Sequence, residues 1–131
     1  MIWVEVFAVF VVCHLVGDFI LQTDWQARNK YGGLGSDPER RRALWSHVIV
    51  YTLCFVPAFV WIGIEAGWSR AVIAALLIYI EHLTQDDGRA LDAYMRRIKG
   101  LPQGGNPGLR VAVDQAFHLV FLFGVALYVA G

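Results

Sequence analysis

Long apolar stretches alternate with charged connections along this chain. The pattern predicts four helices, each close to the length needed to cross a hydrocarbon core of ~30 Å. Their expected ranges are residues 1–21, 44–64, 70–86 and 109–130. The third is the shortest, and the second contains Pro57 as a kink of the kind that membrane helices tolerate. We therefore expect an all-α fold, a single four-helix membrane domain over residues 1–131.

The connections between these apolar stretches differ in length. A tight turn over residues 65–69 joins the second and third spans. The first connection contains residues 36–39, Ser-Asp-Pro-Glu, a typical helix start with a capping residue and proline. The last connection carries apolar residues at helical spacing over residues 91–98, which predicts a short amphipathic helix lying on the membrane.

Composition supports membrane residence over a soluble helical bundle, the alternative reading of the same helices. Apolar residues make up 57% of the chain and charged residues 17%, and the mean hydropathy is +0.50. The formal net charge is zero, so no broad basic surface indicates nucleic acid as a partner. Cys13 and Cys54 both lie in apolar stretches, where thiols act as small apolar fillers.

The basic residues are segregated to one side of the predicted bundle. Of the eleven lysines and arginines, only Arg70 falls on the side of the termini. Positively charged loops stay in the cytoplasm, so we expect a multi-pass protein of the bacterial inner membrane with both termini in the periplasm. The five tryptophans fall near the predicted boundaries, as an aromatic belt does.

All four histidines lie within the predicted spans, one in each: His14, His47, His82 and His118. Three have an aspartate four positions away, in the pairs His14–Asp18, His82–Asp86 and Asp114–His118. This spacing places both side chains on one face of a helix, one turn apart. Two ligands so placed can bind one metal ion, as in a His-Glu-x-x-His helix.

The order of each pair matches the direction of its span. Asp18 and Asp86 lie near the inner ends of descending spans, whereas on the ascending fourth span the order inverts and Asp114 comes first. All these polar groups are therefore expected at one depth near the cytoplasmic face. Ionisable groups inside a membrane cost ~2.5–3.5 kcal/mol each unless they are paired or bound to a cation.

A divalent cation offsets several of these costs together, so we expect one or two ions, with zinc favoured over manganese, iron or magnesium. The expected ligands are His14, Asp18, His47, His82, Asp86, Asp114 and His118. The three aspartates among them are also the candidate catalytic acids and bases. The alternative is a buried hydrogen-bond network in which each histidine pairs with its own aspartate, but such pairing does not explain the matched depths.

Other polar residues are candidates for supporting roles. Those expected to orient ligands or contact substrate are Gln22, Tyr51 and Gln115, with Arg28 and Lys30 as candidates to bind an anion. Three further acidic residues could act as an acid or base, although solvation at a helix end is their more common role: Asp24, Glu81 and Asp87.

The segment from His14 to Lys30, with its His-x3-Asp-Phe-x-Leu-Gln signature, closely resembles a small family of bacterial and phage integral membrane proteins, domain of unknown function 3307. The later motifs around His47, Asp86 and His118 resemble that family in the same order. The resemblance implies a membrane protein and no particular activity. A weak internal repeat of the His-x3-Asp motif also suggests a duplicated helical hairpin.

The expected function is that of a metal-dependent hydrolase at the cytoplasmic membrane face, acting on a phosphoester or lipid-linked substrate. Two alternatives stay open: a carrier or sensor for metal ions or protons, and a haem protein with two axial histidines. The lipid bilayer is the expected partner, and a homo-oligomer is compatible with the sequence.

Overall fold

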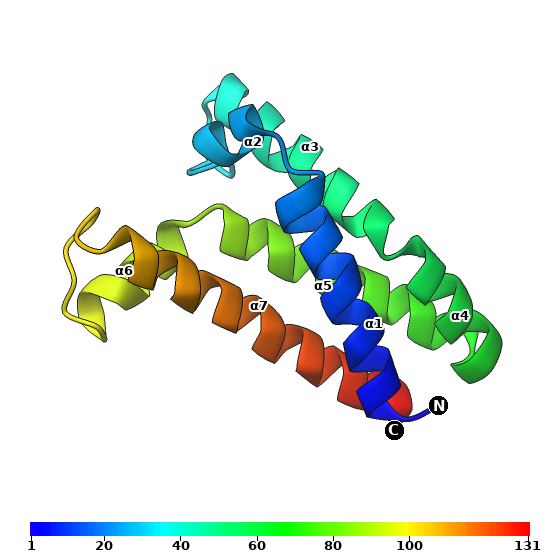
Figure 1. The fold of residues 1–131 in the computed structure, drawn as a ribbon. Coiled ribbons are helices and arrows are strands. Elements are labelled where there is room, and N and C mark those ends of the chain that lie inside the picture. The colour runs from blue at the N-terminus through cyan, green and yellow to red at the C-terminus, as the bar shows by residue number, and fades with distance from the viewer.

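The computed structural model describes residues 1–131 and is helical throughout, which confirms the predicted all-α class. Seven α-helices and one π-helical turn follow in the order α1 Trp3–Leu15, η1 Val16–Ile20, α2 Asp24–Asn29, α3 Pro38–Cys54, α4 Val56–Ala66, α5 Trp68–Asp86, α6 Arg89–Arg97 and α7 Pro107–Ala130. Both termini lie near the α4–α5 turn at one end of the molecule, and α2 and α6 lie toward the other end (Figure 1).

Two of the predicted spans are not regular α-helices throughout. The first changes from α1 to the π-helical turn η1 without leaving the helical path. The second consists of α3 and α4, which meet at Phe55 with a bend of 46°. Pro57 explains this bend, because it has no N–H to donate to the carbonyl of Leu53 and its ring crowds that carbonyl.

Two helical segments, Trp3–Ile20 and α7, are long and apolar enough to cross a membrane, and the bent pair α3–α4 is a third if it forms one span. The structure thus supports two or three of the four predicted spans. Helix α5 has 19 residues but is less apolar than these segments, because it carries Arg70, Glu81 and Asp86. It is the helix that contributes most charge to the cluster described below.

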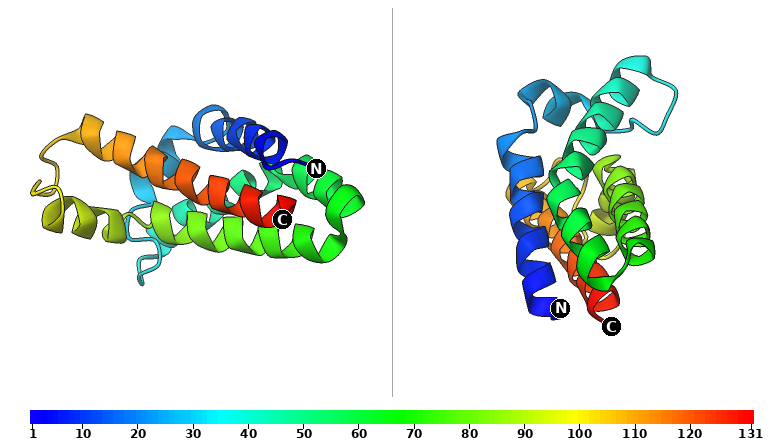
Figure 2. Two further views of the ribbon diagram at one scale, coloured as in Figure 1. Left: turned by 90° about the horizontal axis from the view of Figure 1, so that it is seen from below. Right: turned by 90° about the vertical axis from the view of Figure 1, so that its right-hand side faces the viewer.

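Large apolar side chains cover the outside of the helices. Val12, Ile64 and Val120 are 61%, 70% and 68% exposed, and many others are exposed by more than a third. Apolar surface this extensive is typical of a membrane or partner interface. Helices α1, α3, α4, α5 and α7 lie side by side in the two rotated views (Figure 2), and each contributes residues to one buried apolar core.

The connections follow the prediction except in the bounds of two segments. Helix α3 starts at Pro38 as expected, because the Asp37 carboxylate accepts the N–H groups of Glu39 and Arg40. The predicted amphipathic helix is found as α6, although Ile98 lies beyond its end and is 67% exposed. The turn predicted over residues 65–69 is shorter, since only Gly67, with φ of +102°, lies between α4 and α5.

Candidate metal centre

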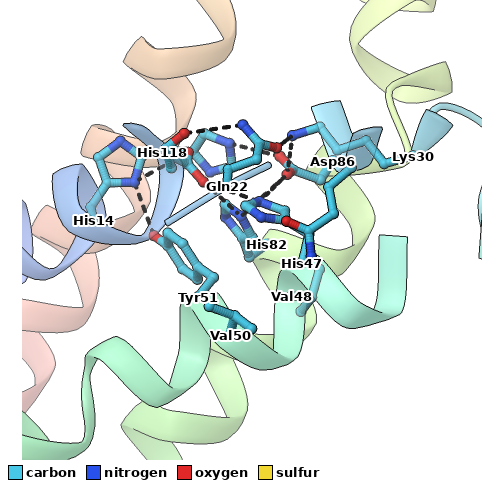
Figure 3. Close-up of polar contacts among 12 residues, drawn as sticks. His14, Gln22, Lys30, His47, Val48, Val50, Tyr51, His82, Asp86 and His118 are labelled. Atoms are coloured by element: carbon cyan, nitrogen blue, oxygen red, sulfur yellow. Dashed lines mark hydrogen bonds and ion pairs between the residues drawn. The ribbon is translucent and has the colours of Figure 1, made fainter. Parts of the chain in front are cut away.

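A buried polar cluster lies at the end of the bundle where α2 and α3 begin (Figure 3). It receives one histidine from each of α1, α3, α5 and α7, and all four rings are at most 1% exposed. Asp18 from η1 and Asp86 from α5 are also buried, and Asp114 from α7 is half-buried. The residues that the sequence placed at a common depth thus lie together.

Four ligand-type atoms converge at the centre of this cluster. His47 Nε2 lies 2.9 Å from Asp86 Oδ2 and 3.0 Å from His82 Nε2. Asp18 Oδ1 lies 3.2 Å from both of these imidazole nitrogens. His82 Nε2 and Asp86 Oδ2 are also 3.2 Å apart. A tetrahedral ion with bonds of about 2.0–2.1 Å separates its ligands by about 3.3 Å, so these spacings suit one such ion.

The bonding of these atoms also favours a cation. Asp18 Oδ1 is buried and accepts no hydrogen bond within the protein. The His47 and His82 nitrogens face each other, so at least one of them must lack a proton. Two nitrogens and two carboxylate oxygens form a common donor set for zinc, manganese or iron.

The π-helical turn determines where Asp18 points. Gly17 in this turn packs on Tyr51, and a Cβ at this glycine would lie 2.6 Å from Tyr51 Cδ2. The Tyr51 ring in turn stacks on His82, with centroids 3.4 Å apart and planes within 3°. A side chain at position 17 therefore could not fit without moving either the turn or the ring that supports His82.

His14 lies beside the centre, and both of its ring nitrogens have protein partners. Nδ1 forms a hydrogen bond of 3.0 Å with the Tyr51 hydroxyl, and Nε2 one of 2.8 Å with Gln115 Oε1. Its distance to Asp18 Oδ2 is 3.6 Å. The structure thus gives His14 a supporting position, and the predicted supporters Tyr51 and Gln115 both act on it.

A second group surrounds His118. Its Nε2 lies 3.2 Å from Asp86 Oδ1 and 3.7 Å from Asp114 Oδ2. Its Nδ1 lies 3.3 Å from Glu81 Oε1. Glu81 is only 8% exposed, so the role of helix-end solvation considered from the sequence is wrong for this residue. In the sequence, Glu81 stands next to His82 within an apolar stretch, and this could have predicted its burial.

The predicted cationic residues separate into two groups. Lys30 Nζ lies 2.6 Å from both Asp86 Oδ2 and Gln22 Oε1, so this lysine and Gln22 join the cluster. Arg28 pairs with Asp24 at 2.9 Å, and both side chains are 77% exposed. Arg28 therefore lies outside the site.

Asp87 follows Asp86 directly but has a structural role. Its carboxylate accepts the N–H of Leu34 and pairs with Arg89 at 2.7 Å. Burial raises the pKa of the Asp87 carboxyl, but the bonds from Arg89 and Leu34 outweigh it and leave that pKa below its usual value. The residue holds the connection before α3 against the end of α5.

A small cleft of about 80 Å³ leads from the cluster to the surface. It is lined by Asp86 and Asp114 from the cluster and by Lys30 and Arg110, with Ala27, Tyr31, Gln85 and Gly88 completing its walls. Arg110 was expected only as a cytoplasmic charge, and its Nε is held by Asp92 Oδ1 at 2.8 Å. The cleft is therefore lined by two cations and two carboxylates.

A family model matches residues 6–130, and its description reads "Protein of unknown function (DUF3307)". The chain belongs to this family. This confirms the family that the sequence resembles, over residues 6–130. No curated protein and no solved structure matches the chain. The family description gives no activity, so the function is inferred from the residues of the site.

Proposed function

We propose that this protein crosses the bacterial inner membrane four times, with its basic end in the cytoplasm and both termini in the periplasm. The exposed apolar surface and the common location of the termini support this topology (Figure 1). Helix α5 is the remaining span, the third in chain order. It packs against α3, α4 and α7, and it directs Val72, Leu76 and Ile80 outward, each more than half exposed.

In this proposal Asp18, His47, His82 and Asp86 bind one divalent cation, with zinc favoured. The observation that carries it is the set of five interatomic spacings of 2.9–3.2 Å among their four buried donor atoms. Groups on three separate elements meet at the spacing of a tetrahedral coordination sphere. Pairing within single helices does not require this geometry.

The proposed reaction is hydrolysis of a phosphoester. When bound, the divalent cation supplies an activated water molecule and polarises the phosphoryl group. Lys30 and Arg110 bind the anionic substrate at the cleft. Asp114, which lines the same cleft, accepts a proton from the water whose oxygen attacks phosphorus. The bond from phosphorus to the leaving oxygen breaks, and that oxygen takes up the proton.

An apolar groove supports a lipid-linked substrate. This groove has a volume of about 230 Å³ and lies among α5, α6 and α7, lined by Thr84, Gln85, Ala90, Leu91, Tyr94 and Phe117. Gln85 also lines the polar cleft, so the two spaces adjoin at this residue. A phosphoester head group in the cleft could therefore place its apolar chain in the groove.

The geometry favours this reading over the two alternatives. A conduit needs polar lining throughout, yet a core of thirteen buried residues, all apolar except for the Tyr51 hydroxyl, fills the rest of the interior. A haem needs a porphyrin between its axial histidines, yet the His82 ring centroid lies 5.1 Å from that of His47 and 4.6 Å from that of His118. The rings leave room for ions only.

The test is turnover by the purified protein on phosphoester and acyl-ester substrates, each with and without a chelator. We expect hydrolysis of phosphoesters alone, lost with chelator and restored by added metal. His82→Asn should abolish it, and Arg28→Ala, outside the site, should retain it. Turnover that survives chelation, or equal loss in both variants, would contradict the proposal.

A further inference from the structure

We propose that the site is binuclear, with a second divalent cation bound by His118 Nε2, Asp86 Oδ1 and Asp114 Oδ2, the other oxygen of Asp114 being the one that accepts the proton from water. This inference rests on the proposed metal centre and extends it. His118 is fully buried, and its Nε2 forms no hydrogen bond within the protein. Its Nε2 instead faces one oxygen from each of the two aspartates, at 3.2 and 3.7 Å.

Asp86 connects the two sites through its two carboxylate oxygens. Oδ2 faces His47 and His82 at the first site, whereas Oδ1 faces His118. A carboxylate that offers one oxygen to each ion is a common bridge in two-metal centres, whose ions lie about 3.5–4 Å apart. The position of Asp86 thus places the second ion directly beside the first.

Glu81 completes the second site from behind. Its Oε1 lies 3.3 Å from His118 Nδ1, on the far side of the ring from the two aspartates. A carboxylate in this position keeps the proton on Nδ1 and leaves Nε2 free to bind a metal. Glu81 is therefore a positioning residue, and its burial has a reason that a single-ion site does not supply.

The charge of the cluster also accommodates a second cation. Four carboxylates lie in or beside it, from Asp18, Glu81, Asp86 and Asp114, and Lys30 is the only fixed cation in contact with them. One divalent ion leaves the cluster with one net negative charge when the histidines are neutral, which is costly in an apolar interior. A second divalent ion leaves one net positive charge instead, which an anionic substrate at the cleft can balance.

Access separates the two sites. Asp86, shared by both sites, and Asp114, a ligand of the second site alone, line the cleft, whereas neither Asp18 nor any of the four histidines does. Asp114 is therefore the ligand through which a phosphate in the cleft would approach the second ion. Its ligands are two carboxylates and one imidazole, a set that suits Mn²⁺ as well as Zn²⁺.

Metal-depleted protein in detergent, titrated with Mn²⁺, tests this proposal. We expect about two equivalents of Mn²⁺ per chain and the spectrum of a spin-coupled pair in electron paramagnetic resonance. His118→Asn should bind about one equivalent and give an uncoupled signal. Asp114→Asn is a second variant with the same expected result, and it keeps the proposal testable if His118→Asn does not fold.

Two results would overturn the binuclear site. Wild type that binds about one equivalent, unchanged in His118→Asn and lost in His47→Asn, would leave the hydrolase proposal intact and remove the second ion. Two equivalents that stay coupled in both His118→Asn and Asp114→Asn would place the second ion elsewhere. Wild type that binds no ion would instead refute the metal centre as a whole, so the two failures are distinguishable.

Discussion

The two halves of the bundle interior are built on the same helices but follow opposite rules. Toward the termini, apolar side chains such as Phe10, Ile62 and Leu122 are fully buried and fill the interior. Toward α2 and α6, the same helices bury histidines and carboxylates. The apolar half secures the helix arrangement, and that arrangement brings the costly groups of the polar half together, in our proposal around a common cation.

The largest effect on both metal binding and stability is expected from a substitution at Asp86. Asp86→Ala removes the buried carboxylate that we propose as the bridge and leaves the partly buried Lys30 ammonium without its ion-pair partner. We expect complete loss of bound metal and a loss of about 3–5 kcal/mol in the free energy of unfolding, as when one partner of a buried ion pair is removed. Metal content and thermal unfolding in detergent measure both effects.

The matched control is the neighbouring residue. Asp87→Ala removes a buried carboxylate that pairs with Arg89 and lies outside the cluster. It should retain the metal. Equal metal loss in both variants would show that Asp86 acts through folding alone.

A cavity in the apolar half tests whether this half contributes to stability and not to metal binding. Leu122→Ala should lower the free energy of unfolding by about 2–5 kcal/mol, because a fully buried side chain is truncated in a packed core. Metal stoichiometry should not change while the protein is folded. Metal loss at temperatures where the variant remains folded would mean that the two halves are not separable.

Gly17, at the boundary between the two halves, tests whether the π-helical turn η1 positions Asp18 for metal binding. Gly17→Ala brings a methyl group against Tyr51 and displaces the turn that carries Asp18. We expect metal affinity to fall about 10- to 100-fold, the usual effect of disturbing the support of a ligand. Isothermal titration with Zn²⁺ measures this, and Gly124→Ala, where the added methyl meets no neighbour, is the control. Equal affinity in both variants would remove the positioning role of η1.

The smallest expected effect lies outside the proposed cluster, at the ion pair between Asp92 of α6 and Arg110 of α7. Burial raises the pKa of the Asp92 carboxyl, but hydrogen bonds from Arg110 and Tyr31 outweigh it and leave that pKa below its usual value of 3.8. A lowered folded-state pKa contributes stability at neutral pH that is lost as the pH falls through it. Asp92→Asn should therefore destabilise the protein by about 1 kcal/mol at pH 7.

The pH profile distinguishes this cause from a packing defect. The difference in unfolding temperature between Asp92→Asn and wild type should shrink as the pH falls below the lowered pKa of Asp92. A difference that stays constant between neutral and acid pH would show that charge pairing with Arg110 is not the source.

Periodicity and spacing predicted the parts that depend on local sequence. The helix start at Asp37, the kink associated with Pro57 and the amphipathic helix α6 follow from side-chain chemistry within a few residues. The shared depth of the histidines follows from the inverted order of the Asp114–His118 pair. These features need no knowledge of how the helices rotate about their axes.

Contacts across helices could not be predicted in this way. His14 and His118 have the same spacing to an aspartate, yet Tyr51 and Gln115 engage both nitrogens of His14, and His118 faces Asp86 on another helix. Helix rotation decides this difference. The π-helical turn is also set by packing, since Gly17 must approach Tyr51 closely. Lys30 reaches Asp86 only because α2 folds back over the cluster.

Anomalous scattering at the absorption edge of the bound metal, from crystals of the purified protein, tests the central claim most directly. We expect an anomalous peak about 2.0–2.1 Å from the Nε2 atoms of both His47 and His82, in contact with Asp18 and Asp86. The same arrangement of side chains with no anomalous peak, in protein purified with zinc and manganese present, would contradict it.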